Sequence, residues 1–244
     1  MEKYSWKARC IKSSATMADS VPAANNYHRW VFGKFCNFLI ADGVTMEVGA
    51  GHGAFTRMLV TVSKKVIATD IDHEALLRIS NELNHCTNVE TINMNGVDIN
   101  KAYSCVDNIV AINILEHIRN DVEFIQNCRK KIKTEGKLIV FVPALQLLYS
   151  VLDEQAGHYK RYSRKELEQM LKNNGFNLVY SHYFNFIGFW GWLINKLLRS
   201  KLNSGLVNSQ VRLFNKFVWL VNFFEIFSFF CGQSLLVVGE KKIN

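Results

Sequence analysis

The chain has 244 residues, of which 49% are hydrophobic and 20% are charged, and its formal net charge at pH 7 is +8. This length suits one large domain with a full-sized core, and the composition excludes an intrinsically disordered chain and a typical membrane protein. The positive charge would suit RNA or an anionic membrane surface, but Lys and Arg occur in short, scattered clusters such as Lys130, Lys131 and Lys133, which is typical of a solvated surface.

The six cysteines are far apart in the sequence, and no two of them form a C-x-x-C pair. This spacing argues against a zinc site and a redox dithiol, so no metal site is predicted. Reduced thiols in a cytoplasmic protein are the simplest expectation. The charged residues between Glu2 and Lys12 leave no apolar stretch of signal-peptide length, so secretion is not expected.

Short β-rich runs alternate with segments of helical periodicity in the first part of the chain. The predicted strands are Thr45–Val48, Lys65–Asp70, Val89–Met94, Val106–Ile112 and Lys137–Val142. The predicted helices between them are Ala54–Val62, His73–Leu83 and Asp121–Lys131. Strands and helices in regular alternation predict a parallel sheet that is covered by helices on both faces.

The remaining part of the chain is predicted to complete the same sheet. An S-x-x-E capping box at Ser163 and Glu166 predicts a helix that begins there and ends at Gly175. Two apolar-rich runs, Asn177–Phe184 and Ser234–Glu240, predict two closing strands, which bring the total to seven. We therefore expect an α/β fold with a mostly parallel sheet and one antiparallel closing strand.

The strongest local motif is the glycine-rich run from Met46 to Phe55, where the first predicted strand turns into the first helix. Such a tight turn needs residues without a Cβ, and it lets a ligand approach the backbone amides and the helix N-terminus. By itself the motif is ambiguous, because Gly49, Gly51 and Ala54 also satisfy the G-x-G-x-x-G/A dinucleotide fingerprint.

Nearby carboxylates help to distinguish the ligand classes. Glu47 lies two residues before Gly49, where a pyrophosphate gains nothing from a negative charge and a cationic ligand is favoured. Asp70 ends the second predicted strand, where it can accept hydrogen bonds from ribose hydroxyls, while Asp72 is better spaced to cap the next helix. Asp98, after the third strand, can accept the exocyclic amine of an adenine or form a turn.

With these motifs, the sequence resembles the class I S-adenosylmethionine-dependent methyltransferases over roughly residues 45–145. The motifs that carry the resemblance are Met46–Phe55, Ala68–Asp72, Val97-Asp98 and Asn113–Ile118. The resemblance implies a Rossmann-like fold with S-adenosylmethionine as the cofactor. It also implies cofactor contacts from Glu47, Gly49, Gly51, Gly53, Asp70, Ile71, Asp98 and Asn113.

A narrower similarity continues beyond this core, to bacterial methyltransferases that are often found beside glycosyltransferases and, more distantly, to the quinone-biosynthesis methyltransferases. Its motifs are Phe141–Ala144, Leu148-Tyr149, Asp153, Gly157–Ser163, Gly175-Phe176 and Asn185. This similarity implies methyl transfer to a small-molecule or a lipid- or glycan-linked acceptor. The expected organisation is one domain, with a flexible arm (1–26), a lead-in helix (Tyr27–Ile40, within 27–43), a cofactor-binding core (45–145) and an acceptor-side half (146–244).

Three other functions remain open at this stage. An RNA methyltransferase would suit the positive charge, but the sequence contains no appended RNA-binding motif. A nicotinamide oxidoreductase is disfavoured by Glu47 in the glycine loop. A non-catalytic methyltransferase-like protein would bind a partner through the hydrophobic segment near the C-terminus.

Two histidines are candidate general bases for an acceptor that must lose a proton. His117 follows the fourth predicted strand and His158 follows the fifth, so both belong to the carboxyl edge where open α/β sheets bind ligands. The usual pKa range of histidine suits proton transfer near neutral pH. The structural alternatives are that His117 only shapes the pocket and that His158 only anchors its loop.

Tyr159, Arg161 and Tyr162 surround His158 in the sequence and are candidate acceptor contacts. The guanidinium of Arg161 can bind a phosphate or a carboxylate through two parallel hydrogen bonds. The alternative is that Arg161 is a surface cation without a ligand.

A strongly hydrophobic helical segment, residues 186–231, separates the last two predicted strands. In the predicted helix Val211–Phe230, the polar residues Arg212, Asn215, Asn222 and Glu225 form only a narrow stripe. The apolar face is therefore wider than one packing surface needs, although Lys216 and Glu225 interrupt it before 18 apolar residues accumulate. The segment is predicted to be a lid or ordinary core, a dimer face, or a peripheral contact with the inner membrane face, supported by Lys196, Arg199 and Lys201.

Overall fold

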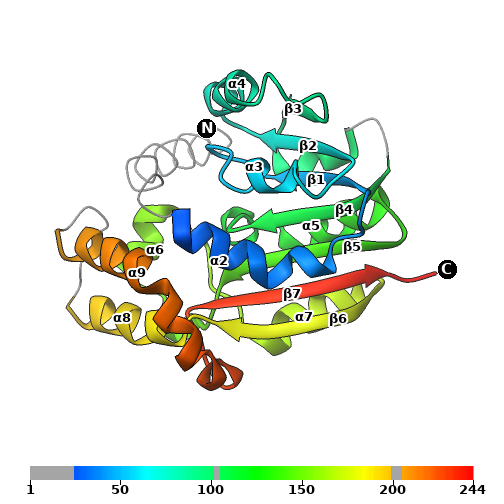
Figure 1. The fold of residues 1–244 in the computed structure, drawn as a ribbon. Coiled ribbons are helices and arrows are strands. Elements are labelled where there is room, and N and C mark those ends of the chain that lie inside the picture. The colour runs from blue at the N-terminus through cyan, green and yellow to red at the C-terminus, as the bar shows by residue number, and fades with distance from the viewer. Residues whose placement is uncertain (1–24, 102–104, 199–204, 244) are drawn as a thin grey trace, which may run out of the picture.

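A twisted sheet of seven strands forms the centre of the molecule (Figure 1). The computed structural model describes residues 25–101, 105–198 and 205–243. In chain order the strands are β1 (Val44–Val48), β2 (Lys65–Asp70), β3 (Val89–Asn93), β4 (Val106–Ile112), β5 (Ile132–Pro143), β6 (Phe176–Phe184) and β7 (Ser234–Lys241). Their spatial order is β3-β2-β1-β4-β5-β7-β6.

Helices connect the strands and cover both faces of the sheet (Figure 1). The α-helices are α2 (Asn25–Phe35), α3 (Thr56–Leu59), α4 (His73–Glu82), α5 (Asp121–Lys131), α6 (Val151–Ala156), α7 (Arg164–Asn173), α8 (Phe186–Leu197) and α9 (Gly205–Phe224). Short 3₁₀ helices are η3 (Cys36–Phe38), η4 (Gly96–Lys101), η5 (Leu115–His117), η6 (Gln146–Leu148) and η7 (Glu225–Phe229).

Strands β1 to β5 pair in parallel, whereas β7 lies between β5 and β6 and is antiparallel to both. The strand order reverses between β1 and β4, which is the point where open α/β sheets bind their ligands beyond the carboxyl ends of the strands. The structure thus confirms the predicted Rossmann-like fold class with its antiparallel closing strand.

Alternate residues of the inner strands supply two separate cores, one on each face of the sheet. Leu138 and Val140 of β5 face the core that also holds Phe124 of α5 and Leu171 of α7. The intervening Ile139 of β5 faces the opposite core, together with Phe35 of α2 and Leu59 of α3. Both faces of the central strands are apolar, and the sheet can be covered on both sides for this reason.

Several predicted boundaries require correction. The helix expected at Ala54–Val62 is only the four-residue α3, followed by turns to residue 62. Strand β5 begins at Ile132 instead of Lys137, because Ile132 pairs with Val106 before the register shifts. Within that shift Glu135 has a left-handed backbone with φ 62°, which the strand periodicity does not predict.

The ends of helices α7 and α2 also differ in detail from the predictions. Ser163 caps α7 by accepting the amide of Glu166, but the carboxylate of Glu166 contacts Lys160 instead of closing a capping box. Gly175 follows the helix with φ 80°, as predicted for its left-handed end. The lead-in helix α2 stops at Phe35 and continues as a 3₁₀ turn, so it is shorter than Tyr27–Ile40.

Some predictions fall on residues that the structure does not describe. Residues 1–24 of the predicted arm, Cys10, Arg199 and Lys201 lie outside the described residues. The other five cysteines are free thiols, as expected for a reduced protein.

Candidate active site

The three glycines of the β1–α3 loop have left-handed backbones but serve different purposes. A Cβ on Gly49 (φ 76°) would lie 1.9 Å from Cδ1 of Ile114, and one on Gly53 (φ 75°) would lie 2.8 Å from Cγ1 of Ile79. These two glycines are needed for close packing. Gly51 (φ 51°) has nothing within 4 Å of its Cβ position, so a ligand can approach the backbone there.

Asp70, at the carboxyl end of β2, fixes this open part of the loop. Its Oδ2 accepts the amide N–H of Gly51 at 2.7 Å, and its Oδ1 accepts that of Asp72 at 2.8 Å. Asp72 caps α4 by accepting the amides of Glu74 and Ala75, so the cap is supplied by Asp72, as predicted. Each oxygen of Asp70 retains a lone pair for a ribose hydroxyl. Ribose binding by Asp70 stays a prediction that this geometry allows.

Glu47 is buried in β1 beneath the loop. Its Oε2 accepts the hydroxyl of Thr56 at 2.5 Å. Burial raises the pKa of Glu47 to about 8, because the charged carboxylate is removed from water. The carboxyl group is therefore largely protonated at neutral pH in the free protein, and a cation bound near it would favour ionisation.

The other predicted cofactor residues follow neighbouring strands and share the same carboxyl edge. Ile71 follows β2 and is half-buried, and Asp98 lies in η4, after β3. Asn113 follows β4 with φ 53°, and its amide donates to the carbonyl of Phe141 while its side chain remains exposed. The structure therefore brings these residues to the edge that holds the glycine loop, and their contacts with a cofactor stay predictions.

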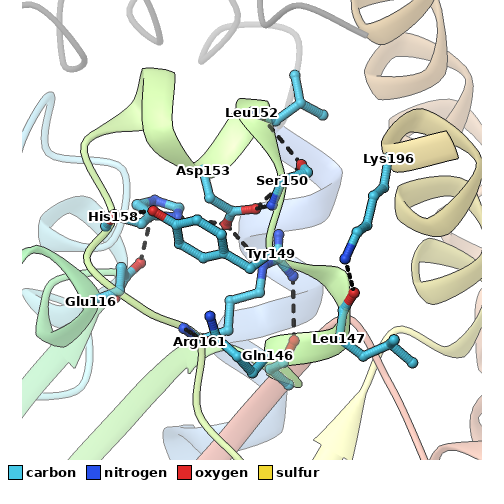
Figure 2. Close-up of polar contacts among 11 residues, drawn as sticks. Glu116, Gln146, Leu147, Tyr149, Ser150, Leu152, Asp153, His158, Arg161 and Lys196 are labelled. Carbon is cyan, nitrogen blue, oxygen red and sulfur yellow. Dashed lines mark hydrogen bonds and ion pairs between the residues drawn. The ribbon is translucent and has the colours of Figure 1, made fainter. Parts of the chain in front are cut away.

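Beyond β5, the buried carboxylate of Asp153 organises residues 146–162, which begin the predicted acceptor-side half and are here called the acceptor-side loop (Figure 2). Oδ1 of Asp153 lies 2.8 Å from Nε of Arg161 and 2.9 Å from Nδ1 of His158. Oδ2 accepts the amide N–H of Ser150, whose own hydroxyl caps α6, so Ser150 and Asp153 form a complete capping box. Burial raises the pKa of Asp153, but the hydrogen bonds with His158 and Arg161 and the charge of Arg161 outweigh this effect and lower it. The short helix α6 thus positions the carboxylate of Asp153, which contacts both His158 and Arg161.

Arg161 differs from both sequence interpretations. It is only 2% exposed, so it is not a surface cation, and the anionic group that it binds is the chain's own Asp153. A second nitrogen donates to the carbonyl of Ala144 at 3.3 Å, and the ring of Trp192 in α8 covers the guanidinium at 5.0 Å. Asp153 thus engages the guanidinium and Trp192 covers it, and a contact between Arg161 and an acceptor stays a prediction.

The two tyrosines beside Arg161 lie in opposite environments. Tyr162 is fully buried, and its hydroxyl lies 3.0 Å from Oδ2 of Asp121 and 3.1 Å from the carbonyl of Leu115. Its hydroxyl is thus engaged within the protein, and its contact with an acceptor stays a prediction. Tyr159 is 45% exposed, while its amide donates to the carbonyl of Glu116. Of the three predicted acceptor contacts, only Tyr159 presents its side chain to solvent.

The two candidate bases lie side by side. The rings of His117 and His158 are 4.7 Å apart and nearly perpendicular, although one follows β4 and the other follows β5. Burial, with a further contribution from His158, lowers the pKa of His117 to about 3 and keeps its ring neutral. The contact of His158 with Asp153 supports the loop-anchoring alternative, and it does not exclude a role for the other ring nitrogen, Nε2.

Glu116 completes this cluster. It is fully buried, and within the described part of the chain neither of its carboxyl oxygens has a hydrogen-bond partner. Oε1 lies 4.0 Å from Nε2 of His158, and burial raises the pKa of Glu116 to about 7. One ligand atom each from Glu116, His117 and His158 lies within 4.8 Å of the others, a spacing at which a small metal ion could be held. The sequence spacing did not predict such a group.

Sequence reasoning assigned no role to Glu116, Asp121 or Asp153. A local signal existed for Asp153, because Ser150 and Asp153 have the spacing of a capping box. No local signal existed for Asp121, which contacts Tyr162 and Lys160 from another helix. Glu116 lay within a recognised motif, but its burial depends on the loop that folds over it.

Known proteins resemble this chain in sequence. The model of a family described as "Methyltransferase domain" matches residues 27–181. A probable S-adenosylmethionine-dependent methyltransferase of Mycobacterium tuberculosis is 24% identical over 133 residues, which are 54% of this chain and 47% of that protein. The mitochondrial ubiquinone biosynthesis O-methyltransferase of Rattus norvegicus is 28% identical over 196 residues, covering 69% of this chain and 55% of that protein.

A solved structure shows the same fold. The N-methyltransferase NodS of Bradyrhizobium japonicum, in complex with S-adenosyl-L-homocysteine, superimposes with a TM-score of 0.55 at 13% identity and covers 90% of this chain and 88% of that one. The chain spans about half the length of the curated relatives that it matches.

Proposed function

This chain belongs to the class I S-adenosylmethionine-dependent methyltransferases, and from that membership we propose that it transfers a methyl group to a small-molecule or a lipid- or glycan-linked acceptor. The observation that carries the proposal is the open backbone at Gly51, which Asp70 holds in place while Glu47 lies buried beneath the loop. A buried acid beneath the glycine loop suits a cationic nucleoside better than a pyrophosphate.

The bound cofactor would supply an electrophilic methyl group on a sulfonium, which passes in line to a nucleophile of the acceptor and leaves S-adenosylhomocysteine. The protein would act mainly by aligning donor and acceptor at the carboxyl edge, which can supply much of the acceleration. Asp70 would hold the ribose and Asp98 the adenine. Glu47 would ionise as the cation binds, because a nearby positive charge favours its carboxylate form.

An acceptor hydroxyl would also need a base, whereas an amine or an anionic acceptor would not. His158 is the better placed of the two histidines for this role. Asp153 contacts its Nδ1 and so favours the tautomer in which Nε2 carries the free lone pair. His117 stays neutral and accepts a proton poorly, because its pKa is lowered to about 3.

One relative supports the acceptor class, and the sequence contains no appended RNA-binding motif. The rat relative is named for O-methylation in ubiquinone biosynthesis, which concerns a small molecule. An RNA acceptor remains the second candidate because of the net charge of +8, and it predicts salt-sensitive RNA binding. We further propose that the protein works in the cytoplasm.

Titration calorimetry with the purified chain tests the activity class. We expect micromolar binding of S-adenosylmethionine and S-adenosylhomocysteine and no binding of NAD. The Asp70→Asn variant should weaken binding by on the order of 1–3 kcal/mol, through one lost charged hydrogen bond to the ribose and a looser contact with Gly51.

Asp72→Asn is the matched control, because Asn also caps helices and the side chain of Asp72 accepts the amides of Glu74 and Ala75 at the start of α4. It should leave the affinity unchanged. NAD binding without S-adenosylmethionine binding would overturn the proposal. Equal losses in the Asp70 and Asp72 variants would remove Asp70 from the ribose site.

A further inference from the structure

Helices α8 and α9, the following η7 and Phe230 present a broad apolar surface, here called the α8–α9 face. The side chains of Leu197, Phe223, Ile226 and Phe230 are 74%, 74%, 77% and 80% exposed. Large apolar residues of this kind are usually buried, and contiguous apolar patches on soluble proteins commonly mark binding sites. The face is therefore expected to contact something other than water.

Two asparagines of α9, Asn215 and Asn222, are turned toward α2. The side-chain oxygen of Asn215 accepts the amide of Tyr27 in α2 at 3.1 Å. The side-chain oxygen of Asn222 accepts the indole N–H of Trp30 at 2.8 Å and lies 3.3 Å from Nζ of Lys34. The polar side of α9 thus packs on α2, and this pairing turns apolar side chains of α9 outward. The exposure is a consequence of specific packing.

The single acidic residue of the segment is also turned inward. Residues 186–231 contain five Lys or Arg residues and only one Asp or Glu, which is Glu225. Oε1 of Glu225 accepts the amide of Asn185 at 3.0 Å, and Oε2 accepts the hydroxyl of Ser228 at 3.1 Å. Arg212 and Lys216 of α9 are exposed. The charges that accompany the apolar face in the described part of the segment are therefore positive.

The face lies beside the acceptor-side loop. Figure 1 shows α8 and α9 at the end of the sheet to which the parallel strands point. Nζ of Lys196 in α8 donates to the carbonyl of Leu147 in η6 at 2.6 Å (Figure 2), and the ring of Trp192 covers Arg161. The exposed side chain of Leu147 extends the apolar surface toward the loop. Whatever binds the face will lie next to the acceptor-side loop.

We propose that the α8–α9 face binds the surface of an anionic phospholipid bilayer, with its aromatic and aliphatic side chains among the headgroups and its basic residues against the lipid phosphates. Apolar residues flanked by Lys and Arg are typical of protein segments that lie in the plane of such an interface. Within the described ranges, no helix is long and apolar enough to cross a bilayer. The proposal concerns the surface alone and does not depend on methyl transfer.

Flotation with vesicles tests the proposal. The full chain is mixed with vesicles of phosphatidylcholine alone, or with about one third phosphatidylglycerol, at low and high KCl. We expect flotation with the anionic vesicles, reduced by salt because part of the attraction is electrostatic. The fluorescence of the exposed Trp219 should shift to shorter wavelength on binding.

Two variants separate the apolar and the basic contributions. Phe223→Ser with Ile226→Ser, and Arg212→Glu with Lys216→Glu, should each weaken binding to anionic vesicles by roughly tenfold or more. The control is Leu77→Ser with Arg78→Glu, an exposed apolar and basic pair on α4, which lies apart from α8 and α9 (Figure 1). The control should bind vesicles like the unchanged chain.

Binding of S-adenosylhomocysteine is measured on every variant, to show that the fold is retained and to keep this test separate from that of the proposed function. Absence of flotation by a correctly folded chain would overturn the proposal. So would a dimer in sedimentation equilibrium that the Phe223→Ser, Ile226→Ser variant dissociates, because a second copy would then cover the face. Equal losses in the α4 control would show that the binding is non-specific.

Discussion

The two ends of the site are built in different ways, although both lie on the carboxyl edge of one sheet. At β1 and β2, backbone amides and glycines form the loop, and a partly exposed carboxylate, Asp70, holds it in place. Beyond β5, buried ionisable side chains form the loop, with Asp153 between Arg161 and His158. The first region can accept a ligand without losing internal contacts, whereas Asp153 in the second region already binds both Arg161 and His158.

This difference predicts how each region responds to substitution. Changes at Asp70 should alter binding and leave stability largely unaffected, since Asp70 is partly exposed and a Cβ on its partner Gly51 would meet nothing within 4 Å. Changes at the acceptor end should alter stability first, because removing one member leaves a buried charge without its partner. Three experiments examine this contrast, beginning with the largest expected effect.

Breaking the Arg161 and Asp153 pair should be the most damaging change. Arg161→Ala is expected to lower the free energy of unfolding by about 3–5 kcal/mol, because the buried carboxylate of Asp153 loses its closest cation. Urea unfolding followed by circular dichroism measures this loss. Lys65→Ala is the control. Both side chains of the Lys65 and Glu90 pair are exposed, so this pair should contribute less than about 1 kcal/mol to the free energy of unfolding. Similar losses of unfolding free energy in both variants would contradict the idea that buried ion pairs stabilise the acceptor-side loop.

The next experiment asks whether His158 does more than anchor its loop. His158→Gln keeps a donor toward Asp153 but removes a basic ring nitrogen, so it separates the two roles. If His158 is the base for an acceptor hydroxyl, methyl transfer should fall roughly 10²-fold while cofactor affinity stays constant. Single-turnover rates with His117→Gln serve as the comparison. Normal turnover in the His158 variant would leave His117, or no base, as the better explanation.

The smallest effect is a change of stability with pH. The folded-state pKa of Glu116 is raised from 4.5 to about 7, so above pH 4.5 the folded protein holds a proton that the unfolded chain has released. Stability must therefore fall as the pH rises through this window, by the linkage between proton binding and folding. Glu116→Gln should flatten the decline up to about pH 7, while Glu47 continues it toward pH 8.

Urea unfolding at several pH values measures this dependence. Glu74→Gln, at an exposed position of α4, is the control and should leave the pH profile unchanged. A Glu116 variant with the same profile as the original chain would show that a bound ion or a partner outside the described residues already compensates the Glu116 carboxylate.

The local elements were largely determined by the sequence alone. Strands Lys65–Asp70 and Val106–Ile112 and the helix Asp121–Lys131 lie where periodicity and capping predict them. Asp72 caps its helix and Gly175 ends another, for reasons contained within a few neighbouring residues. The glycine loop was equally predictable, because its conformation requires residues without a Cβ and the sequence shows where the glycines are.

Only the tertiary structure decided which polar side chains are buried and what they face. Arg161 could not be distinguished from a surface cation, because its partners come from three separate segments, at Asp153, Ala144 and Trp192. The sequence also could not predict that the apolar side of α9 faces outward, because this orientation depends on the hydrogen bond between Asn222 and Trp30, which lies 192 residues earlier in the chain. Periodicity shows that a helix has two faces, but the direction of each face depends on the surface against which the helix packs.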